Sequence, residues 1–195
     1  MEEMIDIYDE NFNKIGVKSR FDVHKYGFKH KVVQCYIINK IDNVKWLYFQ
    51  QRSFDKDNYP GFYDIACAGH IDSGEEASSS MIRELQEEIG LRVEKSQLNY
   101  AGTKLENKNH GNILDDEICE LYVLSIENEN FVLGEEVEDM VKVLFNDYKS
   151  WVNEEYKVLK VFSINSKKYI ELNEKNICEH IRDYNKDLLK VIENI

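Results

Sequence analysis

Apolar runs rich in β-branched and aromatic residues predict four strands in the first third of the chain. They cover residues 4–8, 31–39, 45–51 and 63–68. Asp42 and Asn43 separate the second and third runs, and both residue types favour tight turns. We therefore expect these two strands to pair as an antiparallel hairpin, and Gly69 to end the fourth strand.

A helical spacing of apolar residues follows the fourth strand. Over residues 75–89, Ser78, Ile82, Leu85 and Ile89 fall on one stripe, and Gly90 supplies a left-handed stop. Residues 99–104 and 118–126 again have strand character. Beyond residue 141 the pattern predicts a short helix at 146–153 and a strand at 158–164.

The last 22 residues, 174–195, predict one long amphipathic helix. Its inward positions are Ile177, Ile181, Leu188 and Ile192. Such a helix can complete the core or pair two subunits as a homodimer, and we expect it to complete the core.

Strands on both sides of one central helix indicate an α/β fold with a mixed sheet, and not a regular alternation of parallel strands and helices. The 195 residues suit one domain, 1–195, with a C-terminal helical extension from about residue 146.

Charge and cysteine usage narrow the classes of function. The formal net charge is -12, whereas proteins that grip a nucleic-acid backbone need basic stripes, so no nucleic-acid polymer is expected as a partner. The four cysteines form no Cys-x-x-Cys pair, which argues against a cysteine-built zinc site. Neither a signal-peptide pattern nor an apolar stretch of about 20 residues is present, so we expect a cytoplasmic protein with free thiols and no membrane partner.

The central helix carries three carboxylates that can act together. Glu84, Glu87 and Glu88 stand at positions i, i+3 and i+4 and project from the same side of the helix. Most acidic faces are simply solvated. Here Arg83 is the one basic residue of the helix and lies one turn before Glu87, where it can orient that carboxylate. Such a cluster suits Mg²⁺ or Mn²⁺, which prefer oxygen ligands.

The sequence around these glutamates favours a metal-binding cluster over a solvated acidic face. Residues 69–91, GHIDSGEEASSSMIRELQEEIGL, contain a glycine, five residues, Glu75, seven residues and then RELQEEIGL. This stretch resembles the Nudix box at every fixed position. The resemblance implies the Nudix α/β/α sandwich and a metal-dependent enzyme that hydrolyses a diphosphate linkage in a small molecule, typically a nucleoside diphosphate derivative.

The resemblance also implies roles for single residues. The metal ligands would be the main-chain carbonyl of Gly69 and the carboxylates of Glu84, Glu87 and Glu88. Two of these, Glu87 and Glu88, would also be catalytic. The structural residues of the box would be Glu75 and Arg83, which hold loop and helix together, and Gly90. Among several acidic residues after the last long strand, Glu136 is the favoured general base, with Glu117 as its rival.

The sequence before the box resembles a subgroup of the family that includes the type I isopentenyl-diphosphate isomerases and hydrolase-like relatives. In QQRSFDKDNYPGFYDIACAGH, Arg52 and Lys56 precede Pro60 in the order of that subgroup, which implies that both contact the diphosphate. The subgroup further implies a second metal site, formed by His24, His30, His70, Asp115 and Glu117.

An isomerase acting on a prenyl diphosphate is the main alternative to a hydrolase. Those isomerases carry a catalytic cysteine immediately before the Gly-His pair, where this chain has Ala68. Cys67 lies one residue earlier, and on a strand that offset turns its side chain to the opposite face, so we expect it in the core. A non-catalytic ligand sensor is a third possibility, but such proteins usually lose box glutamates, and all are present here. The substrate's leaving group is not fixed by any motif, and the resemblance to the subgroup leaves room for a prenyl or sugar diphosphate in place of a nucleotide.

Overall fold

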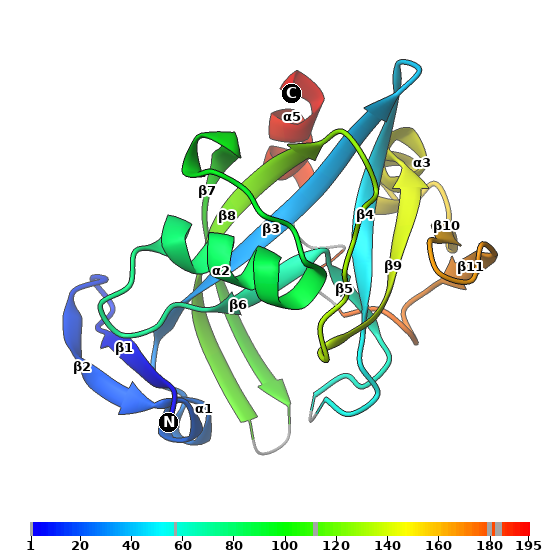
Figure 1. Ribbon diagram of the computed structural model, residues 1–195. Coiled ribbons are helices and arrows are strands. Elements are labelled where there is room, and N and C mark those ends of the chain that lie inside the picture. Colours follow the sequence, from blue (N-terminus) through cyan, green and yellow to red (C-terminus); the bar gives the residue numbers. More distant parts are fainter. Residues whose placement is uncertain (1, 57, 111–112, 179–180, 182–184) are drawn as a thin grey trace.

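The computed structural model describes residues 2–56, 58–110, 113–178, 181 and 185–195. Within these ranges, eleven strands form one mixed sheet, with β11-β10-β9-β4-β3-β1-β2 along its main path (Figure 1). The strands of the main path are β1 (Met4–Tyr8), β2 (Lys14–Ser19), β3 (His30–Ile41), β4 (Val44–Arg52), β9 (Val137–Leu144), β10 (Leu159–Ser163) and β11 (Tyr169–Leu172). Four further strands join it, β5 (Tyr63–Ile65), β6 (Cys67–His70), β7 (Leu98–His110) and β8 (Ile113–Ile126).

Strand β3 organises the sheet because it has neighbours on both sides along most of its length. It pairs antiparallel with β4 and β6 and parallel with β8. Asp42 and Asn43 join β3 to β4 with positive φ angles of 50° and 64°, as a tight hairpin turn requires. The predicted hairpin is thereby confirmed.

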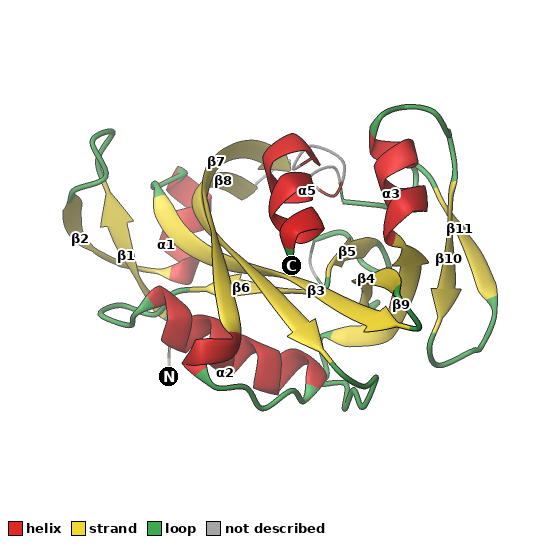
Figure 2. Cartoon of the chain, turned by 90° about the horizontal axis from the view of Figure 1, so that it is seen from above, coloured by secondary structure: helices red, strands yellow, loops and turns green. Residues whose placement is uncertain are grey.

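Helices cover both faces of the sheet (Figure 2). On one face lies α2 (Ala77–Ile89), which packs on the core cluster that includes Val33, Cys35 and Ile37 of β3. The alternate β3 residues, Val32, Tyr36 and Ile38, belong to the opposite cluster, which includes residues of α3 (Phe145–Val152) and α5 (Asn185–Asn194). The α/β/α sandwich is therefore confirmed. Helix α1 (Arg20–Tyr26) and the 3₁₀ helix η1 (Lys95–Gln97) complete the described helices.

The central helix matches its predicted position, but one residue of its stripe was assigned wrongly. Gly90 ends the helix at φ 71°, as expected. Met81 is fully buried, whereas Ile82 is only partly buried. Glu88 also lies on the buried side and is 6% exposed. The three glutamates therefore do not share one solvated face, because the helix is rotated so that Glu88 points toward the sheet.

The predicted helix over residues 174–195 is wrong in its first part. The chain forms β11 and then a turn, in which the Lys175 and Asn173 amides donate to the Asn173 and Asn176 side chains. These asparagines offer the backbone local hydrogen bonds that compete with a helix. Ile177 then bridges to Tyr63. The described helix begins at residue 185, and residues 179–180 and 182–184 lie outside the described ranges. The predicted inward positions Ile177, Ile181, Leu188 and Ile192 are all buried.

Several elements were not predicted, namely β2, α1, η1, β9 and β11, and β7 and β8 are longer than expected. The stretch after residue 146 also contains the β10–β11 hairpin, so it is not simply a helical extension. None of the described helices is long and apolar enough to cross a membrane.

Two isoleucines at the end of the chain test whether this stretch belongs to the core. Ile192 is fully buried and Ile195 is 43% exposed. We expect Ile192→Ala to lower the free energy of unfolding by about 2–5 kcal/mol, because it leaves a cavity. Ile195→Ala should change it by less than about 0.5 kcal/mol. Urea denaturation measures both, and equal effects would contradict the packing described.

Candidate active site

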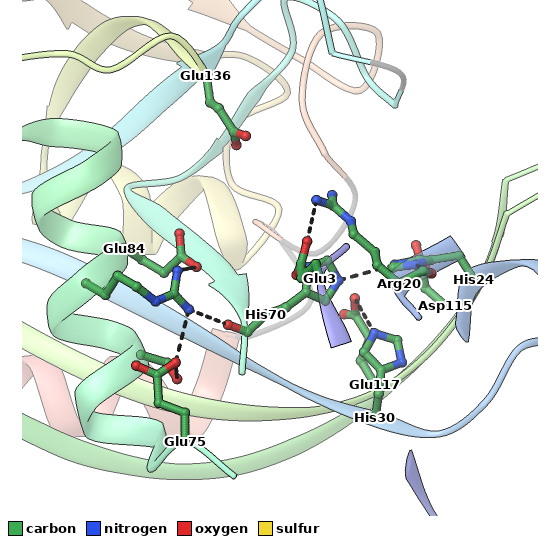
Figure 3. A network of polar contacts seen from close by, with 12 residues as sticks. Glu3, Arg20, His24, His30, His70, Glu75, Glu84, Asp115, Glu117 and Glu136 are labelled. Atoms are coloured by element: carbon green, nitrogen blue, oxygen red, sulfur yellow. Dashed lines mark hydrogen bonds and ion pairs between the residues drawn. The ribbon is translucent and has the colours of Figure 1, made fainter. Parts of the chain in front are cut away.

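A cavity of about 440 Å³ lies between α2, β6 and the far ends of β7 and β8. Eleven of the site residues predicted from the sequence line it. They are His24, Arg52, Lys56, Gly69, His70, Arg83, Glu84, Glu87, Asp115, Glu117 and Glu136. Glu75, Glu88 and His30 do not line the cavity themselves, but each contacts a residue that does. The fold thus brings the box and the upstream histidines to one cavity (Figure 3).

Gly69 and Glu84 approach each other so closely that only glycine fits. A Cβ atom at residue 69 would lie 2.1 Å from Cδ of Glu84. The Glu84 carboxylate therefore passes directly over the β6 backbone, and its side chain is 14% exposed. Glu87 is 62% exposed and extends into the open part of the cavity.

Arg83 joins the loop, the strand and the helix of the box. Its Nη2 donates to the main-chain oxygen of His70 (3.1 Å) and to Glu75 (3.2 Å). Its Nη1 donates to Glu84 (2.7 Å) and to Glu87 (3.3 Å). Ser80 Oγ supports the same Glu75 carboxylate. One guanidinium therefore serves three carboxylates, which leaves net negative charge on this wall.

Glu88 is held against β6 by two long hydrogen bonds. Its Oε2 accepts from the main-chain amide of Ala68 and from Gln50 Nε2, both at 3.3 Å. Burial raises the pKa of Glu88 to about 8, and neighbouring Glu84 adds to the shift. Burial also raises the pKa of Glu84 to about 7, against the opposing effect of Arg83. Both shifts follow chiefly from burial of carboxylates whose charge a single guanidinium does not fully compensate.

The opposite wall carries Glu136 and the two predicted phosphate contacts. The loop before Glu136 packs on the end of α2, where the amides of Val132 and Gly134 donate to the carbonyls of Ile89 and Glu88. A Cβ at residue 134 would lie 2.2 Å from the Glu87 carbonyl oxygen, so glycine is required there too. Glu136 forms an ion pair with Lys56.

Arg52 is positioned by its neighbours at the same wall. Its Nη1 donates to Asp64 (3.1 Å), and Nε and Nη2 donate to the main-chain oxygen of Asn58.

His24, His30 and His70 turn Nε2 toward one another, and Nδ1 of each ring points to a different partner. His24 Nδ1 lies 2.7 Å from the Arg20 carbonyl oxygen, and His30 Nδ1 lies 2.9 Å from that of Phe28. His70 Nδ1 lies 3.2 Å from the Glu3 carboxylate. Each Nδ1 faces an acceptor, which favours the tautomer that carries the proton on Nδ1 and a lone pair on Nε2. The three rings offer nitrogen atoms within 4.8 Å of one another.

Burial favours the neutral form of His30 and of His70. Burial lowers the pKa of His70, and it lowers the pKa of His30 to about 3. Nε2 of His24 and Nε2 of His70 are 3.2 Å apart, and in the tautomer with the proton on Nδ1 their two lone pairs repel each other. Asp115 lies 3.4 Å from His24, and Glu117 lies 3.9 Å from His30.

Two of these atoms also lack hydrogen bonds. Among the described residues, His30 Nε2 and Asp115 Oδ1 are buried and have no hydrogen-bond partner. A divalent ion at the centre of the set would satisfy both atoms and remove the repulsion, so the residues present fit a metal.

The structure separates Cys67 from this cavity. Cys67 is fully buried and belongs to the core cluster under α2, as expected from the sequence. Ala68 lines the cavity in its place. The cavity therefore has no thiol at the position that the isomerases use.

Sequence reasoning missed several cavity residues. Glu3 contacts His70 and accepts a hydrogen bond from Arg20, and the hydrogen bond from His70 lowers the pKa of Glu3 to about 2. The others are Gln34, Asp64, Glu106 and Lys108. A signal existed for Gln34, which interrupts an otherwise apolar run, and for the alternating polar residues of β7. Nothing local showed that these strands meet at the box.

Comparisons with known proteins agree with this architecture. The model of the NUDIX domain matches residues 28–162. An uncharacterised Nudix hydrolase of Clostridium acetobutylicum is 37% identical over 145 residues, which are 73% of this chain and 70% of that protein. Nudix hydrolase 3 of Arabidopsis thaliana is 33% identical over 79% of this chain and only 21% of its own length.

An isopentenyl-diphosphate Delta-isomerase of Serratia proteamaculans is 31% identical over 63% of this chain and 66% of its own. Among solved structures, DR0079 from Deinococcus radiodurans superposes with a TM-score of 0.62 over 98% of both chains at 14% identity. The fold, the box geometry and these relatives agree, and the chain is therefore a member of the Nudix hydrolase family.

Proposed function

We propose that this protein is a divalent-metal-dependent hydrolase that cleaves a diphosphate linkage in a small molecule, for which a nucleoside diphosphate derivative is the favoured class. The observation that carries this proposal is the box cluster, in which Arg83 bonds Glu84 and Glu87, Glu84 lies over Gly69, and Glu88 accepts from the neighbouring Ala68 amide. Oxygen donors of this kind suit Mg²⁺ or Mn²⁺.

The ligands of the box metal would be the Gly69 carbonyl and the carboxylates of Glu84, Glu87 and Glu88. Bound there, the cation would neutralise the diphosphate and acidify a water molecule. An acidic protein can hold a polyanion in this way because the cation compensates both charges.

The chain's own residues would bind the substrate and move the proton. Arg52 and Lys56 line the same cavity and would contact the phosphate oxygens. Lys56 pairs with Glu136 in the substrate-free protein, so a bound phosphate would compete for Lys56 and release the Glu136 carboxylate. Glu136 would accept a proton from the attacking water molecule while the oxygen of that water bonds to phosphorus. The bridging oxygen would then leave with the second phosphate.

The histidine set supports a second metal site within this proposal. Its ligands would be Nε2 of the three histidines, with carboxylate oxygens from Asp115 and Glu117. Imidazole nitrogen favours transition metals over Mg²⁺, so this site would select Zn²⁺ or Mn²⁺.

Isomerisation is the weaker candidate. It requires a thiol that faces the substrate, and Cys67 lies instead under α2 with its pKa raised well above the usual range by burial. Ala68 lines the cavity where that thiol would be needed.

The general base and the box metal are tested by amide substitutions. Glu87→Gln should abolish turnover while far-UV circular dichroism stays unchanged. Glu136→Gln should lower kcat by about 10²–10⁴-fold, the usual contribution of a general base. Turnover is followed by ³¹P NMR on a panel of nucleoside and isoprenoid diphosphates with Mg²⁺. Glu135→Gln is the matched control, since Glu135 does not line the cavity. Full activity of Glu87→Gln would refute the metal assignment.

Gly69→Ala tests the close approach to Glu84. The new methyl group must displace the Glu84 carboxylate, so calorimetric titration should show at least about tenfold weaker Mg²⁺ binding. Gly16→Ala is the control, because its Cβ would meet only Ile7 at an ordinary 3.6 Å. Wild-type Mg²⁺ affinity in Gly69→Ala would mean that Glu84 is not a ligand.

The raised carboxyl pKa values predict how metal stabilisation depends on pH. Glu84 and Glu88 have an ordinary pKa of 4.5 that folding raises to about 7 and about 8. Between pH 4.5 and about pH 8 the metal-free folded protein binds more protons than the unfolded chain, so its stability falls as pH rises. Mg²⁺ should restore that loss. We expect calorimetry to show a larger rise in Tm with Mg²⁺ at pH 8 than at pH 5, and equal rises at both would contradict the metal-binding role of these carboxylates.

A further inference from the structure

The first strand of the chain, β1, is attached to the loop that leads from β6 into the box helix. The Ser73 amide donates to the Met4 carbonyl oxygen at 2.8 Å, and the Ser73 hydroxyl group donates to the Asp6 carboxylate. Ile5, between these two contacts, is fully buried. Asp6 and Ser73 are 67 positions apart in the sequence. The start of the chain therefore takes part in building the cavity.

Glu3, immediately before this strand, contacts His70 with one carboxylate oxygen and Arg20 with the other (Figure 3). Its Oε1 lies 3.2 Å from Nδ1 of His70, and its Oε2 accepts from Nη1 of Arg20 at 3.0 Å. The Arg20 amide also donates to the main-chain oxygen of Glu3 at 2.9 Å. Because the backbone and the second oxygen are both held, the first oxygen has a fixed position beside the imidazole.

His70 differs from the other two histidines in the kind of group that orients it. Nδ1 of His24 and Nδ1 of His30 both face main-chain carbonyl oxygens. A carbonyl oxygen of the backbone is present whatever side chain that residue carries. The orientation of His70 depends instead on the carboxylate of Glu3, so a single substitution removes it.

The Glu3 carboxylate also selects between two hydrogen-bond arrangements of His70. With its proton on Nε2, His70 would donate to Nε2 of His24 at 3.2 Å, and the two rings would satisfy each other. The Nδ1 lone pair of His70 would then face the negative Glu3 oxygen, which is unfavourable. With its proton on Nδ1, His70 donates to Glu3 and keeps the Nε2 lone pair. Glu3 therefore favours the arrangement that a cation needs over a closed histidine pair.

A contribution to stability alone does not account for this arrangement. The side chains of Glu3 and Arg20 are 31% and 51% exposed, and ion pairs as exposed as this one contribute little to folding. By contrast, a carboxylate that accepts from the outer nitrogen of a metal-binding histidine fixes the ring and raises its basicity as a ligand. The contact between Glu3 and His70 has the geometry of that second kind of interaction.

We infer that Glu3 is a positioning residue for the histidine metal site, because its carboxylate holds the proton of His70 on Nδ1 and leaves Nε2 available to a transition-metal ion. Glu3 acts through His70 and is not itself a ligand. This inference rests on the second metal site of the proposed function, and it adds the start of the chain to the parts of the protein that determine metal affinity.

The test measures the tautomer of His70 and the affinity for Zn²⁺ in the full-length chain. The variants are Glu3→Ala and Glu3→Gln, with Glu2→Ala as the matched control, since Glu2 is exposed and does not line the cavity. Long-range ¹H–¹⁵N NMR spectra of the imidazole groups identify the protonated nitrogen without metal and the coordinated nitrogen with Zn²⁺. Competition with a chromophoric chelator gives the Kd of Zn²⁺, and circular dichroism checks the fold.

We expect the wild type and Glu2→Ala to carry the His70 proton on Nδ1 and to bind Zn²⁺ through Nε2. In Glu3→Ala the proton should move to Nε2, and the Kd of Zn²⁺ should rise about 10–100-fold. Glu3→Gln keeps an acceptor for the Nδ1 proton but not the charge, so it should keep the tautomer and lose less affinity. A purely structural role of Glu3 would lower Tm in both variants without moving the proton.

The outcomes separate this inference from the proposed hydrolase. A His70 proton that stays on Nδ1 in Glu3→Ala, or wild-type affinity for Zn²⁺ in that variant, overturns the role of Glu3 and leaves the hydrolase intact. If Glu3→Ala is unfolded, wild-type affinity in Glu3→Gln overturns it as well. Absence of Zn²⁺ from the histidines of the wild type overturns the inference together with the second metal site, while Mg²⁺-dependent turnover still supports the hydrolase. The expected shift of proton and affinity in a protein that cleaves no diphosphate supports the role of Glu3 and overturns the hydrolase.

Discussion

The sharing of one guanidinium among several carboxylates is the interaction on which this structure depends. Arg83 ties Glu75, Glu84 and Glu87 to the strand that ends at His70, so it fixes the box loop against the helix. It cannot neutralise all of them, and Glu88 is buried beside them with its pKa raised to about 8. Under the proposed function a hard cation would compensate the charge of these carboxylates, so the same geometry would serve as a binding site as well as a structural joint.

Strand β3 converts this local arrangement into a larger site. Its central position gives it β6 on one side and β8 on the other, so His70 and Glu117 reach the same cavity although 47 positions separate them in the sequence. Helix α1 adds His24 from a third direction, held by the carbonyl of Arg20. Each ring is oriented by an acceptor at Nδ1, and preorganisation of this kind is typical of metal-binding histidines.

The same sheet explains how a chain that resembles both hydrolases and isomerases can favour hydrolysis. A one-residue step along β6 exchanges the two faces of the strand, which directs Cys67 into the core and Ala68 into the cavity. Gln34 faces Ala68 across the β3–β6 pair. The cavity therefore presents a methyl group at residue 68 and not a thiol, which favours hydrolysis over isomerisation.

The sequence by itself determined the family, the box helix with its stop at Gly90 and the hairpin turn at Asp42 and Asn43, because these depend on spacing and on backbone preferences of single residues. It did not determine the rotation of α2 that buries Glu88, the turn that replaces the first part of the C-terminal helix, or the cavity residues Gln34 and Glu106. These were decided only by the tertiary structure, since they depend on which strands become neighbours. Local pattern carries no information on contacts between segments that lie far apart in the chain.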